Sequence, residues 1–302
     1  MKIGIVLVTF NRLNDLKKVL IEYEEQEKKP EYILVVNNSS TDGTNEFLEN
    51  WKNEKSYLKK YVINLEKNSG GSGGFYRGLK EAINLDSDWI WVSDDDAYPE
   101  RNALSEIEKF YENNESNNIA ALCTSVINNG QVDLTHRKRI IKKPITIEQR
   151  VVEEKEYKKE YFEIDLFSYV GTMINKEFLK SVGLPEKDYF IYYDDTEHSL
   201  RVKNSGKILC IPKAKVNHNV NRTSDDGTLT WRNYYMIRNR LLFYKKHFSK
   251  RYFYYASFDI LFKEFSKRKD KEERLLVKSA INDAKNNKKG LDCKYKPGWS
   301  LK

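Results

Sequence analysis

Residues 89–97 read Trp-Ile-Trp-Val-Ser-Asp-Asp-Asp-Ala, an apolar run that ends in three consecutive aspartates. The run predicts a buried strand, and residues 101–111 after it have the pattern of a helix. Side chains alternate along a strand, so we expect Asp94 and Asp96 to project to one side and Asp95 elsewhere. Carboxylates this close repel one another, and a divalent cation would relieve the repulsion. The stretch therefore favours a site at the carboxyl end of a strand over a solvated acidic loop.

The sequence around this stretch alternates between strand and helix signals, which predicts an α/β protein with a mostly parallel sheet and crossover helices. Strands are expected at residues 2–9, 32–37, 61–65, 89–93 and 120–128, with helices at 13–26, 44–51 and about 76–84. Residues 132–165 are weakly patterned, and we expect hairpins there. After them the pattern predicts strands at 168–175 and 207–211 and helices at 176–182 and 194–204.

The positive charge of the chain belongs to its C-terminal quarter. Residues 231–302 contain 20 Lys and Arg against 7 Asp and Glu, whereas the first 230 residues contain 33 against 38. Basic and aromatic residues are interleaved there, as in helices that lie on membrane surfaces. We therefore expect one domain over residues 1–230 and a helical, basic region over 231–302 that contacts an anionic membrane. Packing of these helices on the domain, or their use in a homo-oligomer, is the alternative interpretation.

Other features of the sequence point to the cytoplasm. No stretch of eighteen apolar residues occurs, so no membrane-spanning helix is expected. The three cysteines, Cys123, Cys210 and Cys293, are odd in number and far apart, which suggests a reducing compartment and no zinc site. We expect a cytoplasmic protein, peripheral on the inner face of the cell membrane.

A glycine-rich segment, residues 68–74, reads Asn-Ser-Gly-Gly-Ser-Gly-Gly and is expected to form a loop that opens a helix. Glycines let backbone N–H groups approach a ligand, and a helix N-terminus favours anions. The phosphate-loop pattern fails because Leu79 stands where lysine is required, and the dinucleotide pattern fails at Tyr76. Arg77, expected in the first turn, suits a diphosphate. A ligand-binding loop is preferred to a merely flexible turn.

Two more polar segments and one histidine are candidates for a site. Residues 37–43 follow the second strand and are polar enough to bond a base or ribose, although for such a segment taken alone an ordinary turn with a helix cap is favoured. Capping also explains one carboxylate of residues 192–198, but not Asp194, Asp195 and Glu197 together. A positioned carboxylate is the usual general base for a sugar hydroxyl. His218 becomes a plausible cation ligand only in company with the aspartates.

Taken together, these segments resemble the family 2 inverting glycosyltransferases of the GT-A fold. The resemblance spans about residues 1–239 and rests on residues 8–12, 37–44, 68–78, 89–97 and 194–197 and on His218. The glycine-rich segment followed by Asp-Asp-Asp-Ala particularly resembles the galactofuranosyltransferase-like branch, which lies close to rhamnosyltransferases.

The resemblance implies a role for each matching position. A cofactor, Mn²⁺ or Mg²⁺, would be held by Asp94, Asp96 and His218. The nucleotide-sugar donor would contact Thr9, Phe10, Arg12, Asn37, Asn68, Arg77, Asp94 and Asp95. Asp195 would be the catalytic base, and the acceptor would contact Asp194, Glu197 and Trp231, with Arg238 closing over the site. The family commonly has aspartate where Asn37 stands. Because an amide both donates and accepts hydrogen bonds, Asn37 can still bond a base, but it does not fix which base the donor carries.

The function implied is the metal-dependent transfer of galactofuranose from UDP-galactofuranose to a lipid-linked or growing bacterial cell-surface glycan, such as capsule, O-antigen or cell wall. Rhamnosyl transfer from dTDP-rhamnose is the alternative within the same class. A nucleotidyltransferase would also use aspartates and a metal, but it would release pyrophosphate. A basic nucleic-acid-binding protein would leave the acidic clusters unexplained, so no nucleic-acid partner is expected.

Overall fold

The computed structural model of the chain describes residues 1–114, 118–219, 229–265 and 270–300. Within these residues the main sheet has ten strands, with the central order β10-β13-β6-β12-β4-β1-β2-β3, while β5 pairs with β13 and β7 with β6. The strands are β1 (Ile3–Thr9), β2 (Tyr32–Asn37), β3 (Lys59–Asn64), β4 (Trp89–Asp94), β5 (Tyr98–Pro99), β6 (Ile119–Asn128), β7 (Gln131–Val132), β10 (Phe162–Ile164), β12 (Thr172–Asn175) and β13 (Lys207–Asn217). Strands β3, β2, β1 and β4 are parallel, and β12 runs antiparallel to β4.

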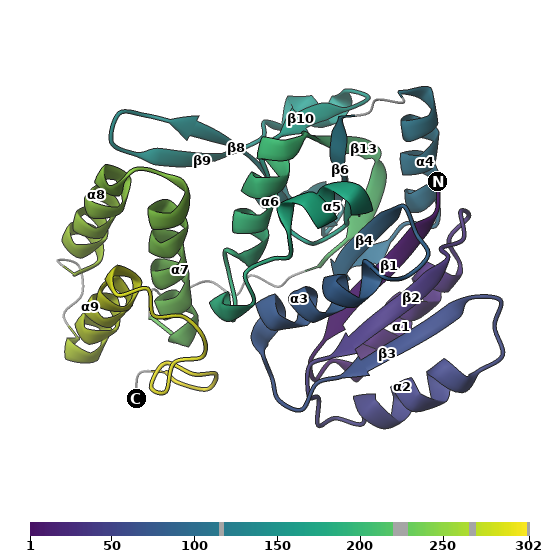
Figure 1. Cartoon of the computed structure of the whole chain (residues 1–302), viewed down its shortest axis with the longest axis horizontal. Helices are drawn as coiled ribbons and strands as arrows, with labels where there is room; N and C mark the ends of the chain where they lie inside the picture. The colour runs from purple at the N-terminus through teal and green to yellow at the C-terminus, as the bar shows by residue number, and fades with distance from the viewer. Residues whose placement is uncertain (115–117, 220–228, 266–269, 301–302) are drawn as a thin grey trace.

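Helices cover both faces of the sheet (Figure 1). One face packs against α1 (Leu13–Glu24), α2 (Thr44–Asn53) and α4 (Ala103–Asn113). The other face packs against α3 (Gly70–Ala82), α5 (Lys176–Val182) and α6 (Asp194–Ser205). Short 3-10 turns η1 (Leu134–His136), η2 (Glu154–Lys158) and η3 (Lys187–Tyr189) complete this part. The predicted α/β class is confirmed.

Strands β1 and β2 are buried along their whole length, as strands covered on both faces must be. That burial explains why the sequence has continuous apolar runs there rather than alternation. The predicted strands and helices between residues 2 and 128 are confirmed, with ends that shift by a few residues, except in the glycine-rich segment.

The glycine-rich segment is not a loop, because α3 already begins at Gly70. Gly74 in this segment and Gly78 one turn further along α3 serve close packing: a Cβ on Gly74 would lie 2.5 Å from Cγ1 of Val8, and one on Gly78 would lie 2.4 Å from Cγ1 of Val6. Helix α3 therefore rests directly on β1. At Gly71, by contrast, a Cβ would meet nothing within 4 Å.

A second, three-stranded sheet joins β11 (Leu166–Phe167), β8 (Arg137–Lys142) and β9 (Ile147–Val151). The β8–β9 hairpin reaches toward the C-terminal helices (Figure 1). It is bonded to them, because the hydroxyl of Tyr244 donates to Ile147 O at 3.1 Å and that of Tyr252 to Lys143 O at 3.0 Å. The weakly patterned region thus forms hairpins, as predicted.

The C-terminal region consists of α7 (Trp231–His247), α8 (Lys250–Ile260), a π-helical turn η4 (Leu261–Phe265) and α9 (Lys271–Lys285), which share a third apolar core. Residues 286–300 follow without helix, so the expected helical character ends at Lys285. None of the helices in the described parts of the chain is long and apolar enough to cross a membrane.

Candidate active site

The three aspartates lie at the carboxyl edge of the parallel strands. Asp94 ends β4, where it pairs with Val8 of β1, and Asp95 and Asp96 follow in a turn. All three line one cavity of about 1050 Å³, named here the triplet cavity. Its walls comprise Val8, Thr9, Phe10, Arg12, Asp15, Asn38, Gly71, Asp94, Asp95, Asp96, Tyr98, Ile191, Tyr192, His218 and Asn219. Strand alternation stops at Asp94. Asp95 was expected to point away from the other two aspartates, but it lines the same cavity.

The charges of the triplet are only partly compensated. Burial raises the pKa of Asp94, although His218 and Arg12 oppose the shift. Burial likewise raises the pKa of Asp95 to about 7, against the attraction of Arg12. Nη1 of Arg12 contacts Asp96 and lies 3.8 Å from Oδ1 of Asp95. Negative charge concentrated in a water-poor site is the condition in which a bound cation is stabilised most.

His218 joins the triplet from the other side of the cavity. It follows the end of β13, where its N–H donates to Ile127 O at 2.8 Å, and its Nε2 lies 3.3 Å from Oδ1 of Asp96. The structure thus brings this histidine to Asp96, as predicted. Across the residues that the structure describes, however, no group of three His, Cys, Asp or Glu side chains is arranged to hold a metal ion. The carboxylate of Asp96 is paired with the guanidinium of Arg12 instead.

A second cavity, of about 490 Å³, lies at the start of α6 and is named here the dyad cavity after Asp194 and Asp195. Its walls comprise Gly71, Phe75, Asp94, Lys138, Gln149, Ser168, Tyr169, Ile191, Tyr192, Tyr193, Asp194, Asp195, Thr196 and Met236. The dyad therefore opens a helix, as predicted, and its carboxylates face a cavity rather than only capping the helix.

Burial dominates the chemistry of the dyad. It raises the pKa of Asp194 well above its ordinary value, and the neighbouring charge of Asp195 adds to the shift. The pKa of Asp195 is also raised by burial, although the N–H of Thr196 donates to its Oδ1 at 2.5 Å and Lys138 is nearby. A carboxylate with a raised pKa takes up a proton more readily near neutral pH.

The two cavities share a wall. Gly71, Asp94, Ile191 and Tyr192 line both of them. The open space at Gly71 is consistent with this position, because a side chain there would project into the cavities. Two clusters of carboxylates about a hundred residues apart in sequence therefore line adjoining cavities.

Asn68 and Arg77 lie elsewhere. They line a third cavity of about 690 Å³, the outer cavity, between α3 and the segment around Gly290. Arg77 falls in the middle of α3 rather than in its first turn, since the helix starts earlier than predicted, and its Nη2 is 3.7 Å from Oε2 of Glu81. The structure does not bring these two residues together with the aspartates.

Asn37 is also away from the cavities. It is buried at the end of β2, where its Nδ2 donates to Oδ1 of Asn64 at 3.0 Å and its Oδ1 accepts from the N–H of Ser40 at 3.0 Å. The structure therefore does not place Asn37 with the aspartates: its amide joins β2 to β3 and holds the following turn. Asn38, the next residue, lines the triplet cavity.

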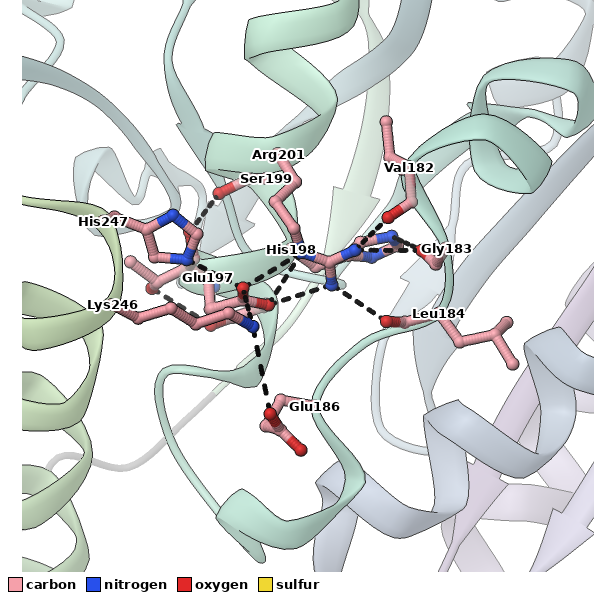
Figure 2. Close-up of polar contacts among 12 residues, drawn as sticks. Val182, Gly183, Leu184, Glu186, Glu197, His198, Ser199, Arg201, Lys246 and His247 are labelled. Atoms are coloured by element: carbon pink, nitrogen blue, oxygen red, sulfur yellow. Dashed lines mark hydrogen bonds and ion pairs between the residues drawn. The ribbon is translucent and has the colours of Figure 1, made fainter. Parts of the chain in front are cut away.

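Glu197, which the sequence placed beside an acceptor, is not among the residues that line the dyad cavity. Its carboxylate lies instead among basic side chains (Figure 2). Glu197 is fully buried, and its carboxylate is 2.9 Å from Nη2 of Arg201, 2.8 Å from Nζ of Lys246 and 2.8 Å from Nε2 of His247. On a helix, residues two positions apart face different directions, which separates Glu197 from Asp195. The carboxylate instead links α6 to the end of α7.

Trp231 was expected to contact the acceptor and Arg238 to close over the site. In the structure both side chains pack within the C-terminal region. The ring of Trp231 lies 6.3 Å from that of Phe190 and is absent from the walls of all three cavities. Arg238 is fully buried, and its guanidinium donates to Gly290 O at 2.8 Å and to Tyr189 O at 3.2 Å.

Several residues of the dyad cavity were missed from the sequence. Lys138 and Gln149 come from the β8–β9 hairpin, and Ser168 comes from the segment after β11. No local pattern marks them, because only the folding back of the hairpin brings them to α6. Tyr192 and Tyr193, by contrast, directly precede the acidic pair, and a run of two aromatics before a helix start was a usable signal.

Comparison with known sequences gives a consistent family. The sequence model of "Glycosyl transferase family 2" matches residues 4–183. A galactofuranosyltransferase, GlfT1 of Mycolicibacterium smegmatis, is 24% identical over 202 residues, covering 67% of this chain and 65% of that protein. The dTDP-rhamnosyl transferase RfbF of Shigella flexneri is 28% identical over 255 residues, covering 80% of this chain and 79% of that protein.

The fold matches solved structures as well. The crystal structure of GalNAc-T7 with UDP, GalNAc and Mn²⁺ superposes with a TM-score of 0.66 at 15% identity, covering 95% of this chain and 56% of that one. At this identity the match concerns the fold. The chain thus spans somewhat less than two thirds of the length of GlfT1 and about half of GalNAc-T7.

Proposed function

The chain belongs to glycosyl transferase family 2, has the GT-A fold, and on that premise we propose that it is a metal-dependent inverting transferase of galactofuranose. The donor would be UDP-galactofuranose, and the acceptor a lipid-linked or growing cell-surface glycan. The similarity to the galactofuranosyltransferase GlfT1 supports the choice of sugar.

The observation that carries the proposal is the shared wall between the triplet and dyad cavities. One cavity offers carboxylates and an imidazole suited to a diphosphate with its cation, and the other offers buried carboxylates suited to a hydroxyl. Asp94 lies between them, so a sugar whose diphosphate lies in the triplet cavity would present its anomeric carbon toward the dyad.

In the proposed reaction Asp195 accepts the proton of the acceptor hydroxyl. The freed oxygen forms a bond to the anomeric carbon from the dyad side, while the bond from that carbon to the diphosphate oxygen breaks and the electron pair leaves with the nucleoside diphosphate. Attack opposite to the leaving group inverts the anomeric centre. Asp194 would orient the acceptor, and Lys138, which lines the same cavity, would hold Asp195 in its charged form.

The triplet fits a divalent cation by the chemistry of its donors. Two carboxylates and one imidazole suit Mn²⁺ or Mg²⁺, and we propose Asp94, Asp96 and His218 as the ligands. Oδ2 of Asp95 is buried without a hydrogen-bond partner among the described residues. A buried acceptor of this kind is consistent with a cation bound beside it. When bound, the cation would stabilise the charge that develops on the departing diphosphate.

The nucleotide would bind at the end of β1. Phe10 lines the triplet cavity, and its side chain, 40% exposed, offers a face on which a base can stack. Thr9 and Arg12 line the same cavity and would contact the diphosphate, with Asp95 beside them. Contacts from Asn68 and Arg77 require the nucleotide to extend toward the outer cavity.

Rhamnosyl transfer from dTDP-rhamnose is the second candidate. The relative RfbF matches more of this chain, and at higher identity, than GlfT1 does. The amide of Asn37 is bonded to Asn64, so it supports neither uracil nor thymine as the base of the donor.

The acceptor would be met at a membrane surface by α8. Its outward stripe includes Tyr254, Phe258 and, one turn further, Phe262, which are 60%, 67% and 68% exposed. The last two rings stack at 6.4 Å between centroids, and the exposed Lys250 and Arg251 stand at the start of the same helix. Aromatic rings beside basic side chains suit an anionic bilayer. Two copies joined by this face would bring two basic surfaces together, which disfavours a homo-oligomer there.

The test is a panel of donors with Mn²⁺: UDP-galactofuranose, UDP-galactose, UDP-N-acetylglucosamine and dTDP-rhamnose, scored by nucleoside diphosphate release and by the mass of the glycosylated acceptor. Release and transfer from UDP-galactofuranose alone would support the proposal. Transfer from dTDP-rhamnose alone would select the second candidate. Release of pyrophosphate instead of a nucleoside diphosphate would contradict both.

A further inference from the structure

The segment that forms the shared wall, residues 189–193 and named here the strap, has an unusual backbone. Phe190, Tyr192 and Tyr193 have φ angles of 68°, 65° and 69°, in the left-handed region that side chains of this size rarely adopt. Each such residue costs about 1–3 kcal/mol, so the surroundings must hold the strap in place. The contacts that do so come from α7 and α3.

On one side the strap is held by Asn239, in the middle of α7. Its side chain is completely buried, and its Nδ2 donates to three strap carbonyls. These belong to Tyr189, Ile191 and Tyr192, at 2.9, 2.8 and 3.0 Å. An amide nitrogen has two hydrogens, so one of them is shared between two carbonyls. A single side chain thus satisfies three backbone groups of the strained segment.

On the other side the strap is held by the start of α3. The N–H of Ser72 donates to Phe190 O at 3.2 Å. A Cβ on Gly70 would lie 1.9 Å from the same oxygen, so the strap is in direct contact with the helix backbone. The strap is thus bonded to α3 on one side and to α7 on the other.

The position of the strap matters for both cavities. Ile191 and Tyr192 line the triplet and dyad cavities, and Tyr193 lines the dyad cavity. The chain then continues directly into Asp194 and Asp195. A displacement of the strap would therefore move the wall and the two carboxylates together.

We propose that Asn239 is a positioning residue for the transfer reaction. By holding the strap it sets where Asp195 stands relative to the donor side of the wall, although it touches neither substrate. This inference rests on the proposed function, and it makes α7 a part of the active-site framework. A misplacement of about 1 Å of a reacting group can reduce a rate about a hundredfold.

The experiment compares the wild-type protein with Asn239→Ala, which has no donor, and with Asn239→Ser, which keeps one. Turnover at saturating substrates should fall about tenfold to a hundredfold in Asn239→Ala and less in Asn239→Ser, with the donor KM within about twofold of wild type. The ratio of donor hydrolysis to sugar transfer should rise, since water needs no placed acceptor. This ratio does not depend on how much of the protein is folded.

Tyr234→Phe is the matched control. It removes another buried bond of α7, from its hydroxyl to Oδ2 of Asp283 at 2.6 Å, and its hydroxyl bonds no strap carbonyl. The ratio in Tyr234→Phe should equal that of wild type. An unchanged ratio and turnover in Asn239→Ala would overturn the inference, as would an equal rise in the control.

Amide hydrogen exchange separates this inference from the proposed function. Residues 189–195 should exchange faster in Asn239→Ala than in wild type or Tyr234→Phe. Faster exchange in a protein whose wild type transfers no sugar would refute the proposed function and leave the role of Asn239 in holding the strap intact. Unchanged exchange in an active enzyme would refute that role alone.

Discussion

Nε2 of His247 lies 2.8 Å from Oε1 of Glu197, and this contact bonds the end of α7 to the first turn of α6 (Figure 2). Arg201 and Lys246 contact the same carboxylate. Three basic side chains therefore contact one buried carboxylate. Because α6 begins with the dyad, the contact fixes the helix that carries Asp195.

Replacing Glu197 by Gln should destabilise the protein strongly. The change leaves the partly buried Arg201 and His247 without the buried carboxylate that they contact, and breaking a buried ion pair typically costs about 3–5 kcal/mol. The free energy of unfolding, measured in urea, should fall accordingly. Glu177→Gln is the control, because that exposed residue forms a comparable pair with Lys180 at 2.8 Å and should cost less than about 1 kcal/mol. Equal losses of unfolding free energy in the two variants would show that the buried Glu197 stabilises the protein no more than an exposed ion pair does.

The contribution of Glu197 should disappear in acid. Burial opposes its charge, but the bonds from His247 and Arg201 prevail and lower its pKa well below the ordinary value. The unfolded chain has a glutamate pKa of about 4.3, so the stabilisation is complete above that pH and is lost as the pH falls toward the folded pKa. The difference in unfolding free energy between wild type and Glu197→Gln should shrink steadily below about pH 4. A constant difference would refute the assignment.

Asp96→Asn should weaken Mn²⁺ binding. The variant loses one of the two proposed carboxylate ligands and keeps the shape of the side chain. Calorimetry in the presence of UDP should give a dissociation constant raised at least about tenfold, equivalent to about 1.4 kcal/mol. Asp86→Asn, in an exposed pair with Lys2, should bind the ion as the wild type does. Unchanged binding by Asp96→Asn would exclude this residue as a ligand.

Asp195→Asn should stop transfer and leave donor binding intact. Removal of a general base typically costs a factor of about 10²–10⁴ in rate. Turnover is measured by nucleoside diphosphate release and donor affinity by calorimetry with a nonreactive donor analogue. A large loss of donor affinity would assign Asp195 to the donor instead, and full turnover would remove it from the reaction.

The double variant Phe258→Ser and Phe262→Ser should bind anionic membranes less. Both side chains are exposed, so the folded protein should lose little stability. Cosedimentation with vesicles of phosphatidylserine and phosphatidylcholine should fall severalfold. Ile21→Ser, at an exposed apolar position on α1, is the control and should bind as wild type does. Equal sedimentation of both variants, together with loss of a concentration-dependent dimer in the first, would favour an oligomer interface.

The sequence was a good guide to what depends on local pattern. Continuous apolar runs predicted β1 and β2 because these strands are buried on both faces, and the aspartates were correctly expected at the edge of the sheet. The acidic pair was correctly expected at a helix start because carboxylates favour that position.

What the sequence could not give depends on neighbours that are distant in the chain. The glycines looked like a ligand loop because nothing local reveals that β1 lies against α3. Glu197 looked like a third acid of the site because two of its basic partners, Lys246 and His247, come from α7, about fifty residues later. Its third partner, Arg201, stands four residues on in α6 and was a local signal. The left-handed φ angles of the strap have no sequence signal, since the contacts that hold it come from Asn239 and from the start of α3, both distant in the chain.

The shared wall also has a kinetic consequence. In the proposed reaction the donor lies in the triplet cavity and the acceptor in the adjoining dyad cavity, so neither would occupy the space that the other needs. On that proposal both substrates would be bound at once, and direct displacement would proceed within a ternary complex, without a glycosylated form of the protein as an intermediate. Double-reciprocal plots for the two substrates would accordingly intersect instead of running parallel.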